Sequence, residues 1–99
     1  MLNIDEKALN YAKKNKGCFV VKTISASGGC LDIPVKSISV EFLKDFKGNK
    51  SYNLHEYDSV KVFIENGLIL DDDIFIYHKI KLPLFGHMFS SKGISIKYI

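Results

Sequence analysis

Apolar and polar residues follow two different periods along this chain, and the helical period is confined to its beginning. The apolar residues of this first segment share one helical face: Ile4, Ala8, Tyr11 and Ala12. Their spacing predicts a helix over about residues 4–15. Asn3 followed by Glu6 is typical of a helix N-cap, and Gly17 is suited to close the C-terminus after a group of lysines.

Beyond Gly17 the period changes to two, which is the spacing of β-strands. The segment Cys18–Ile24 is apolar on both faces, as expected of a strand that is covered on both sides. The further alternating segments are Ser37–Phe42, 60–65, Ile74–Ile80 and Ile94–Tyr98. Turns are predicted at Gly48-Asn49, Glu65-Asn66-Gly67 and Ser91-Lys92-Gly93, and Pro83 is expected to interrupt the strand before it.

The alternation also assigns side chains to faces. The inward residues of the second strand are predicted to be Ile38, Val40 and Phe42. In the segment Ile74–Ile80, one face carries Ile74, Ile76, His78 and Ile80, and the opposite face carries Phe75 and Tyr77. One helix and about six short strands, without a repeat or a linker, predict a single domain over residues 1–99. The predicted fold class is mainly β with one N-terminal helix, a helix-capped β-sandwich or pseudo-barrel.

Charge and apolar run length exclude two classes of partner. Fourteen basic and eleven acidic residues give the chain a formal net charge of +3, and its lysines are scattered along the sequence. Nucleic-acid-binding proteins concentrate their basic residues on one face, so nucleic acid is not expected as a partner. No apolar run approaches the roughly 20 residues that span a bilayer, and no secretory signal pattern is found. We therefore expect a cytoplasmic protein without membrane contact.

Reactive chemistry is expected at one stretch of small residues. Ser25–Pro34 includes two adjacent glycines, Gly28 and Gly29, and delivers Cys30 before the proline. Adjacent glycines permit a tight turn whose N–H groups converge, and such a loop can leave a thiol at its tip. Cys18 lies instead in an apolar run and is predicted to be a small buried hydrophobic residue. Cys30 is therefore the candidate reactive residue.

The order of the elements, together with Gly28-Gly29-Cys30, resembles the HesB-like family, which includes the A-type iron–sulfur carriers. The resemblance is closest to the small branch of that family in which a Cys-Cys or Cys-selenocysteine pair follows glycine. It implies a metal site at Cys30, supported by the two glycines, with iron or an iron–sulfur cluster as the cofactor. It also implies a homo-oligomer, or an iron–sulfur or thiol partner protein.

The sequence departs from the family pattern at two places. The carriers have a Cys-x-Cys pair near the C-terminus, whereas residues 90–99 contain no cysteine. Leu31 stands where the small branch has its second chalcogen. Because iron–sulfur clusters need about four thiolate or equivalent ligands, one protomer with Cys30 cannot hold a cluster alone. Two protomers and an external thiol such as glutathione can supply that number.

Three histidines are candidate additional ligands. His55 and His87 lie in predicted loops, whereas His78 lies on the apolar face of a predicted strand, where a hydrogen-bonded histidine is common. No pair has the short spacing of a zinc motif. Asp71-Asp72-Asp73 lacks the glycine and the glutamate of a calcium loop and is interpreted as a hairpin connection before a strand.

Motifs for phosphate binding, dinucleotide binding or a serine nucleophile are absent from the sequence, so a non-enzymatic role is favoured. The leading hypothesis is a HesB-like protein with a degenerate iron–sulfur or metal-binding site centred on Cys30. One alternative is a thiol-redox protein in which Cys30 forms mixed disulfides or a sulfenic acid. Another is a structural or partner-binding module without a metal.

Overall fold

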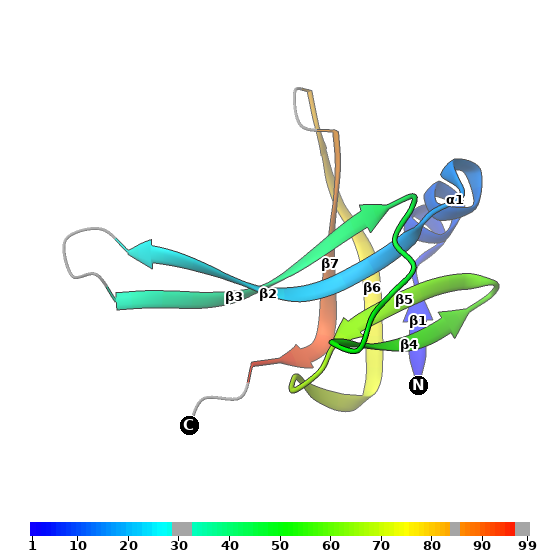
Figure 1. The fold of residues 1–99 in the computed structure, drawn as a ribbon. Coiled ribbons are helices and arrows are strands. Elements are labelled where there is room, and N and C mark those ends of the chain that lie inside the picture. The colour runs from blue at the N-terminus through cyan, green and yellow to red at the C-terminus, as the bar shows by residue number, and fades with distance from the viewer. Residues whose placement is uncertain (29–32, 84–85, 97–99) are drawn as a thin grey trace.

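The computed structural model of the chain describes residues 1–28, 33–83 and 86–96, without the side chains of residues 25–28 and 33–36. Its elements run in the order β1 (Leu2–Ile4), α1 (Glu6–Asn15), β2 (Cys18–Gly28), β3 (Ile33–Leu43), β4 (Tyr52–Tyr57), β5 (Val60–Glu65), β6 (Ile69–Leu82) and β7 (Gly86–Ser95). Two hairpins, β2–β3 and β6–β7, extend from the body in different directions (Figure 1).

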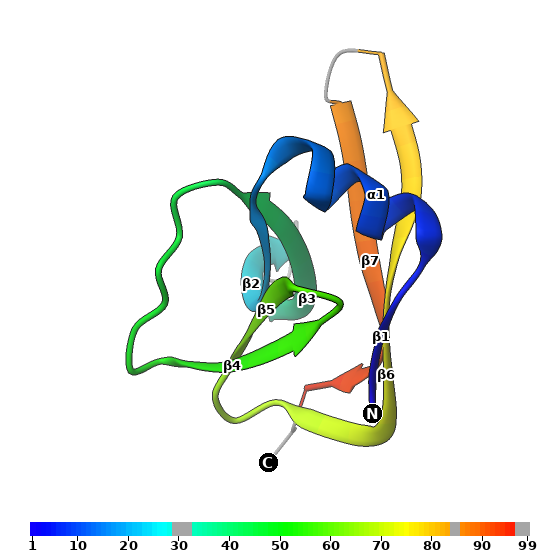
Figure 2. The same cartoon turned by 90° about the vertical axis from the view of Figure 1, so that its right-hand side faces the viewer.

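All these strands belong to one sheet, in the order β1-β6-β7-β3-β2-β5-β4. The pairs β1–β6 and β2–β5 are parallel, and the other neighbours are antiparallel. The two edge strands, β1 and β4, approach each other, so the sheet is a nearly closed, barrel-like form (Figure 2). The predicted fold class is thereby confirmed: the chain is mainly β, with one short helix near the N-terminus.

The chain begins with a strand where the sequence predicts the first turn of the helix. β1 pairs in parallel with the segment 74–76 of β6. Helix α1 starts at Glu6, and its N-cap is Asp5 rather than Asn3, because Asp5 Oδ1 accepts a hydrogen bond from Ala8 N at 2.7 Å. Ile4 is buried as predicted, but it reaches the core from β1. The spacing between Ile4 and Ala8 fits a helix that includes Ile4, and it also fits a strand that ends just before the helix. The apolar pattern alone therefore misplaced the start of the helix.

The C-terminus of α1 also differs in detail from the prediction. Lys16, not Gly17, adopts the left-handed conformation, with φ 54°, and its N–H donates to Ala12 O. Gly17 is needed for close packing, because an added Cβ would clash with the Phe42 ring and lie 2.8 Å from Leu43 O. The glycine therefore lets the chain pass directly beside the end of β3.

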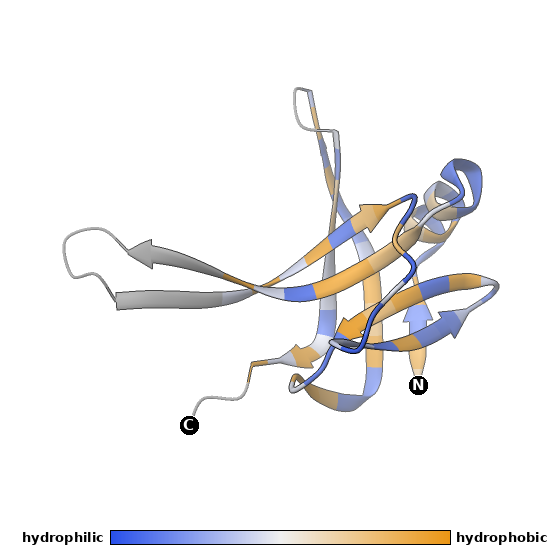
Figure 3. Ribbon diagram, in the orientation of Figure 1, coloured by the Kyte–Doolittle hydropathy of each residue, from blue (hydrophilic) through white to orange (hydrophobic). Residues whose placement is uncertain are grey.

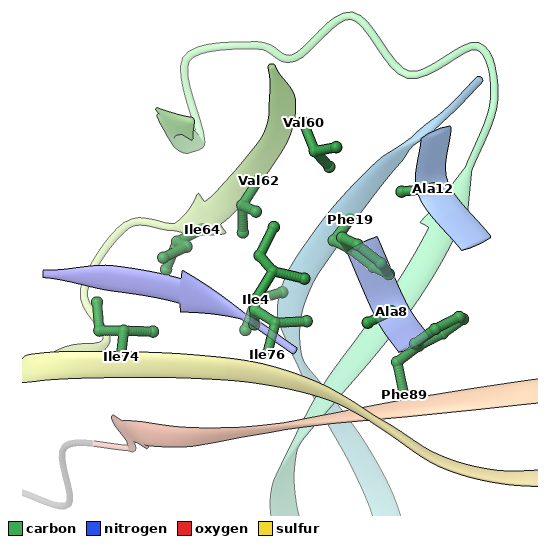
Figure 4. Packing of buried hydrophobic residues seen from close by; sticks show 11 residues of the cluster. Ile4, Ala8, Ala12, Phe19, Val60, Val62, Ile64, Ile74, Ile76 and Phe89 are labelled. Atoms are coloured by element: carbon green, nitrogen blue, oxygen red, sulfur yellow. The ribbon is translucent and has the colours of Figure 1, made fainter. Parts of the chain in front are cut away.

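Strand β2 is buried on both faces over residues 18–21, as its apolar run predicts, but Ile24 is 44% exposed, so the predicted cover does not extend to the end of the segment Cys18–Ile24. The main core lies on one face and comprises Ile4, Ala8, Ala12, Phe19, Val21, Val60, Val62, Ile64, Ile74, Ile76 and Phe89 (Figure 4). On the other face, Leu43, Phe46 and Tyr52 pack against Cys18, Val20 and Phe63. Hydrophobic residues are accordingly concentrated in the part of β2 that crosses the body (Figure 3).

Strand β6 is longer than predicted and contains an irregularity at its acidic segment. Asp71–Asp73 lies inside β6 rather than in a hairpin connection, at a register shift between Leu70 and Phe75. Gly93 lies close to this shift with φ 82°, and a Cβ on it would clash with the Asp73 carbonyl oxygen. Residues 91–93, predicted to be a turn, therefore lie within β7. The backbones of β6 and β7 come so close together at Gly93 that glycine is required there.

A second irregularity corrects one predicted face of β6. The ladder pairs Ile80 with Met88, one residue out of step with the pair before it, so Lys79 is an extra residue in the strand. Because side chains alternate between faces, this bulge turns Ile80 away from the face that carries Ile74 and Ile76. Ile80 is 48% exposed, whereas Ile76 is fully buried. The prediction that they share a face is therefore wrong at Ile80.

Other features of the pattern are present as predicted. The inward side chains of β3 pack against the main core: Ile38, Val40 and Phe42. On β6, Phe75 and Tyr77 stack with ring centroids 5.9 Å apart, and the strand ends at Leu82, before Pro83. Strand β7 continues to Ser95, and residues 97 and 98 of the last predicted strand, Ile94–Tyr98, lie outside the described residues.

Side-chain packing, more than backbone pairing, joins the two hairpins. Among the described residues, β3 and β7 share a single ladder pair, Val40 with Phe89. Phe89 is buried, and its ring centroid lies 4.9 Å from that of Phe19, 5.2 Å from that of Tyr11 and 6.3 Å from that of Phe42. Aromatic contacts of this kind add to the free energy gained from burial alone. Phe89 therefore connects α1, β2, β3 and β7.

Across the ranges that the structure describes, no helix has both the length and the apolar character needed to cross a membrane.

We predict that Phe89→Leu lowers the free energy of unfolding by about 1–3 kcal/mol, because it removes aromatic contacts from a buried position. Chemical denaturation of both proteins at one pH measures the difference. Met88→Ala is the matched control on the same strand, since Met88 is largely exposed, and a change below about 0.5 kcal/mol is expected. Similar losses for the two variants would contradict the central position of Phe89.

Candidate functional site

The stretch that the sequence singles out is largely strand. β2 continues to Gly28 and β3 begins at Ile33, and these two residues pair at the outer end of the hairpin. The loop expected over Ser25–Pro34 is therefore wrong at both ends, because the β2–β3 ladder continues through its small residues. A proline is tolerated there because β3 is paired along only one of its edges at this point. Gly29 and Cys30 lie outside the described residues.

Cys18 is buried and held by backbone carbonyls, as predicted. Its side chain faces the smaller apolar cluster, and its Sγ donates to Leu43 O at 3.4 Å and approaches Phe46 O at 3.8 Å. Burial raises the pKa of the Cys18 thiol, and the positive charge of Lys61 only partly opposes this change. The neutral thiol is favoured, so Cys18 is a poor nucleophile and a poor metal ligand.

Strand β2 also keeps the two cysteines apart. It runs for 11 residues from Cys18 to Gly28, which corresponds to roughly 30 Å for a straight strand. Cys30 follows two residues later, a covalent reach of only about 7 Å. A disulfide requires Cα atoms about 4.4–6.8 Å apart. Within one folded chain, Cys18 and Cys30 therefore cannot form a disulfide or ligate the same metal.

The three candidate histidines all lie in strands, so the expected loop positions of His55 and His87 are wrong. His55 is in β4, paired with Val62 of β5. His87 is in β7, near the outer end of the β6–β7 hairpin, and His78 is in β6. The β6–β7 register brings the last two together: His78 Nε2 and His87 Nδ1 are 2.9 Å apart. His55 is on a different hairpin and does not join them.

Aromatic rings orient this histidine pair. The His78 ring meets the buried Phe89 edge to face, with centroids 5.6 Å apart, and the His87 ring lies 4.4 Å from Tyr11. Partial removal from water lowers the pKa of His87, and the positive charges of His78 and Lys81 lower it further. The separation of the two ring nitrogens fits a hydrogen bond in which one imidazole donates its N–H and the other accepts.

The contribution of Tyr11 to this cluster was missed at the sequence level. The helical pattern assigned Tyr11 to the core face, whereas its ring is half-buried and reaches His87. A signal was present in Pro83, because a hairpin turn next to this proline brings residues 78 and 87 into neighbouring positions on two strands. The pattern gave no reason to connect helix and hairpin, since that requires the tertiary arrangement.

A groove of about 530 Å³ lies where β3 and β7 diverge from their single ladder pair. Exposed apolar side chains of Ile24 and Met88 border it. The side chains of the described residues form no group of three or more histidine, cysteine, aspartate or glutamate residues suited to a metal ion. Within that part of one chain, a complete metal site is therefore not assembled.

These features define a small, mainly β domain with one helix and a Gly-Gly-Cys sequence that starts at the last residue of β2. The model of the CC/Se motif containing family matches residues 1–93, and the chain belongs to this family. Searches among curated proteins and solved structures found no match. The predicted resemblance to small proteins with a Cys-Cys or Cys-selenocysteine pair is thereby confirmed, whereas the wider HesB-like relationship stays a prediction. The chain itself has no adjacent cysteine pair, because Leu31 follows Cys30.

We predict that Cys18 is protected from alkylation in the folded protein. In the Cys30→Ser variant, which leaves Cys18 as the single thiol, iodoacetamide should react at least about tenfold more slowly under native conditions than in denaturant. Burial and the raised pKa both lower the accessible thiolate. Mass spectrometry of timed samples measures the rates. Equal rates in the two conditions would show that the described environment of Cys18 is wrong.

Proposed function

We propose that this chain is a HesB-like protein that binds iron or an iron–sulfur cluster through Cys30, at a site shared between protomers. The observation that carries the proposal is the burial of Cys18. The chain has two cysteines, and Cys18 is held in the apolar interior with a raised pKa. Cys30 is therefore the residue of this chain that corresponds to the Cys or selenocysteine motif for which the family is named.

The number of ligands supports a shared site. An iron–sulfur cluster takes about four thiolate or equivalent ligands, and the length of β2 prevents Cys18 from joining Cys30. Two protomers supply two Cys30 thiolates, and two molecules of an external thiol such as glutathione complete the set. The three histidines stay predicted additional ligands. His78 and His87 lie on the other hairpin of the same protomer, so a ligand role for them favours contact between two chains.

The proposed fold relationship rests on architecture. A nearly closed β-sheet with one helix near the N-terminus, followed by a strand that leads into Gly28-Gly29-Cys30, is the order of elements that the HesB-like resemblance implies. Family membership adds the chalcogen motif. These two observations support the proposal from independent directions.

Anaerobic reconstitution with iron and sulfide tests the proposal. Wild-type protein and Cys18→Ala should take up iron and acid-labile sulfide, with one cluster for about two chains, and should elute as a dimer when loaded. Cys30→Ser should bind neither element. Cys18→Ala is the matched control, because it removes the other thiol of the chain. If all three proteins are equally empty, both as purified and after reconstitution, the metal function is abandoned.

A thiol-redox function is the second candidate, and the geometry of β2 restricts its chemistry. Because Cys18 cannot reach Cys30, oxidation leads to a mixed disulfide with another molecule or to a sulfenic acid. In either reaction the Cys30 thiolate is the nucleophile and is oxidised, while the disulfide or peroxide that it attacks is reduced.

The pH dependence of alkylation distinguishes this candidate. In Cys18→Ala, the rate of reaction of Cys30 with iodoacetamide should follow a thiolate pKa well below the free value of about 8.5, because redox-active thiols are ionised near neutral pH. Stopped samples analysed by mass spectrometry give the profile. An unreactive Cys30, or one with the pKa of a free thiol, would exclude the thiol-redox function. The metal-binding function is tested separately by the reconstitution experiment.

A further inference from the structure

A pocket of about 340 Å³ lies between helix α1 and the β6–β7 hairpin. Figure 2 shows the helix beside this hairpin. The lining residues come from one side of the helix and from the two strands: Lys7, Asn10, Tyr11, Lys14, His78 and His87. The volume corresponds to about eleven water molecules, at roughly 30 Å³ each. An occupant with several heavy atoms therefore fits.

The described lining of this pocket carries two lysines without ion-pair partners, and the nearby Asp5 carboxylate accepts from the backbone N–H groups of Ala8 and His78. Lys7 and Lys14 are seven residues apart, two helical turns, and so lie on the same side of α1. Among the ion pairs of the described residues, Lys13 binds Asp58 at 2.6 Å, whereas neither Lys7 nor Lys14 takes part in one. The described lining contains no carboxylate. An anion is therefore favoured in the pocket, and a metal cation is disfavoured.

The lining of the pocket combines two aromatic rings with a hydrogen-bond donor. Tyr11 and His87 lie ring to ring at 4.4 Å, with an interplanar angle of 48°. The bond between His78 Nε2 and His87 Nδ1 occupies one nitrogen of each imidazole. In a neutral pair, one of the two outer nitrogens then carries a proton and can donate to a ligand. Because the two ring planes are tilted, a planar group can stack on one ring and contact the other at an angle.

Asp5 holds the two walls of the pocket together. Its Oδ1 accepts from Ala8 N at 2.7 Å and caps α1, while its Oδ2 accepts from His78 N at 3.3 Å on β6. Its own N–H donates to Ile76 O at 2.9 Å. The helix and the strand that carries His78 are therefore fixed relative to each other. A site arranged in this way before binding loses less entropy when its ligand arrives.

We propose that this pocket binds a small organic anion, with a phosphate or carboxylate group between the two lysines. The outer imidazole nitrogen that carries a proton donates to the same group. The planar body of the ligand stacks on one of the two rings, Tyr11 or His87, and meets the other at an angle. Anion binding here requires no contribution from Cys30, although a metal held by Cys30 together with His78 or His87 would compete with the anion for these imidazoles.

Titration with phenyl phosphate, followed by NMR of the labelled full chain, tests the site. Amide and imidazole signals of α1, β6 and β7 should shift, with saturable binding that weakens as salt is added. Inorganic phosphate should bind more weakly, because it lacks the stacking group, and phenol should bind more weakly still, because it lacks the charge. Equal binding of phenol and phenyl phosphate, or shifts located elsewhere, would overturn the proposal.

Lysine variants separate a built site from general basic charge. The double variant Lys7→Gln/Lys14→Gln should weaken phenyl phosphate binding by about tenfold or more, because both charged donors are lost. Lys13→Gln is the matched control: it removes the same kind of charge from the same helix outside the pocket and should change affinity by less than about twofold. Unchanged amide spectra of the free variants establish that each is folded. If Lys13→Gln weakens binding as much as the single variant Lys14→Gln, the pocket is not the site.

Discussion

The packing of Phe89 is the contact on which the arrangement of this domain depends. Within the described ranges, the β6–β7 hairpin meets β3 through one ladder pair, so backbone hydrogen bonds contribute little to that junction. The Phe89 side chain fills the space between the helix and both hairpins, in contact with Phe19, Phe42 and Tyr11. Burial of apolar surface is non-directional, and aromatic rings add preferred angles to it. The junction can therefore be firm although the two strands diverge on either side.

The same junction explains where the pocket and the groove form. β3 and β7 separate next to their single ladder pair, and a groove opens where they part. On the helix side, Tyr11 leans from α1 over Phe89 and reaches His87, so the helix closes against the hairpin only as far as these rings allow. At the N-terminus of the helix, Asp5 sets the distance between α1 and β6, because it accepts hydrogen bonds from Ala8 N and His78 N. The ring contacts of Tyr11 and the hydrogen bonds of Asp5 fix the helix against the hairpin at two places, and the pocket lies beside them.

The sequence predicted those elements whose pattern reflects burial directly. The double-sided apolar run at the start of β2 and the alternation in β3 and β5 follow from contact with a core. β4 was not predicted, because its inward positions hold His55 and Tyr57 while Leu54 is 53% exposed. The bulge at Lys79 had no signal either, since nothing in a lysine marks an extra strand residue. At the N-terminus, pairing with β6 decided between two arrangements that the apolar spacing allowed equally.

For the candidate site, sequence reasoning predicted the burial of Cys18 correctly but could not assemble the histidines. A cysteine within an apolar run is predicted to be buried, and the structure confirms this for Cys18. The meeting of His78 and His87 depends on hairpin register, and the approach of Tyr11 depends on helix placement, which no local pattern contains. The consequence is functional. Cys30 follows β2 in the sequence, whereas the histidine pair belongs to the β6–β7 hairpin, so anion binding at the pocket requires no contribution from the thiol (Figure 1).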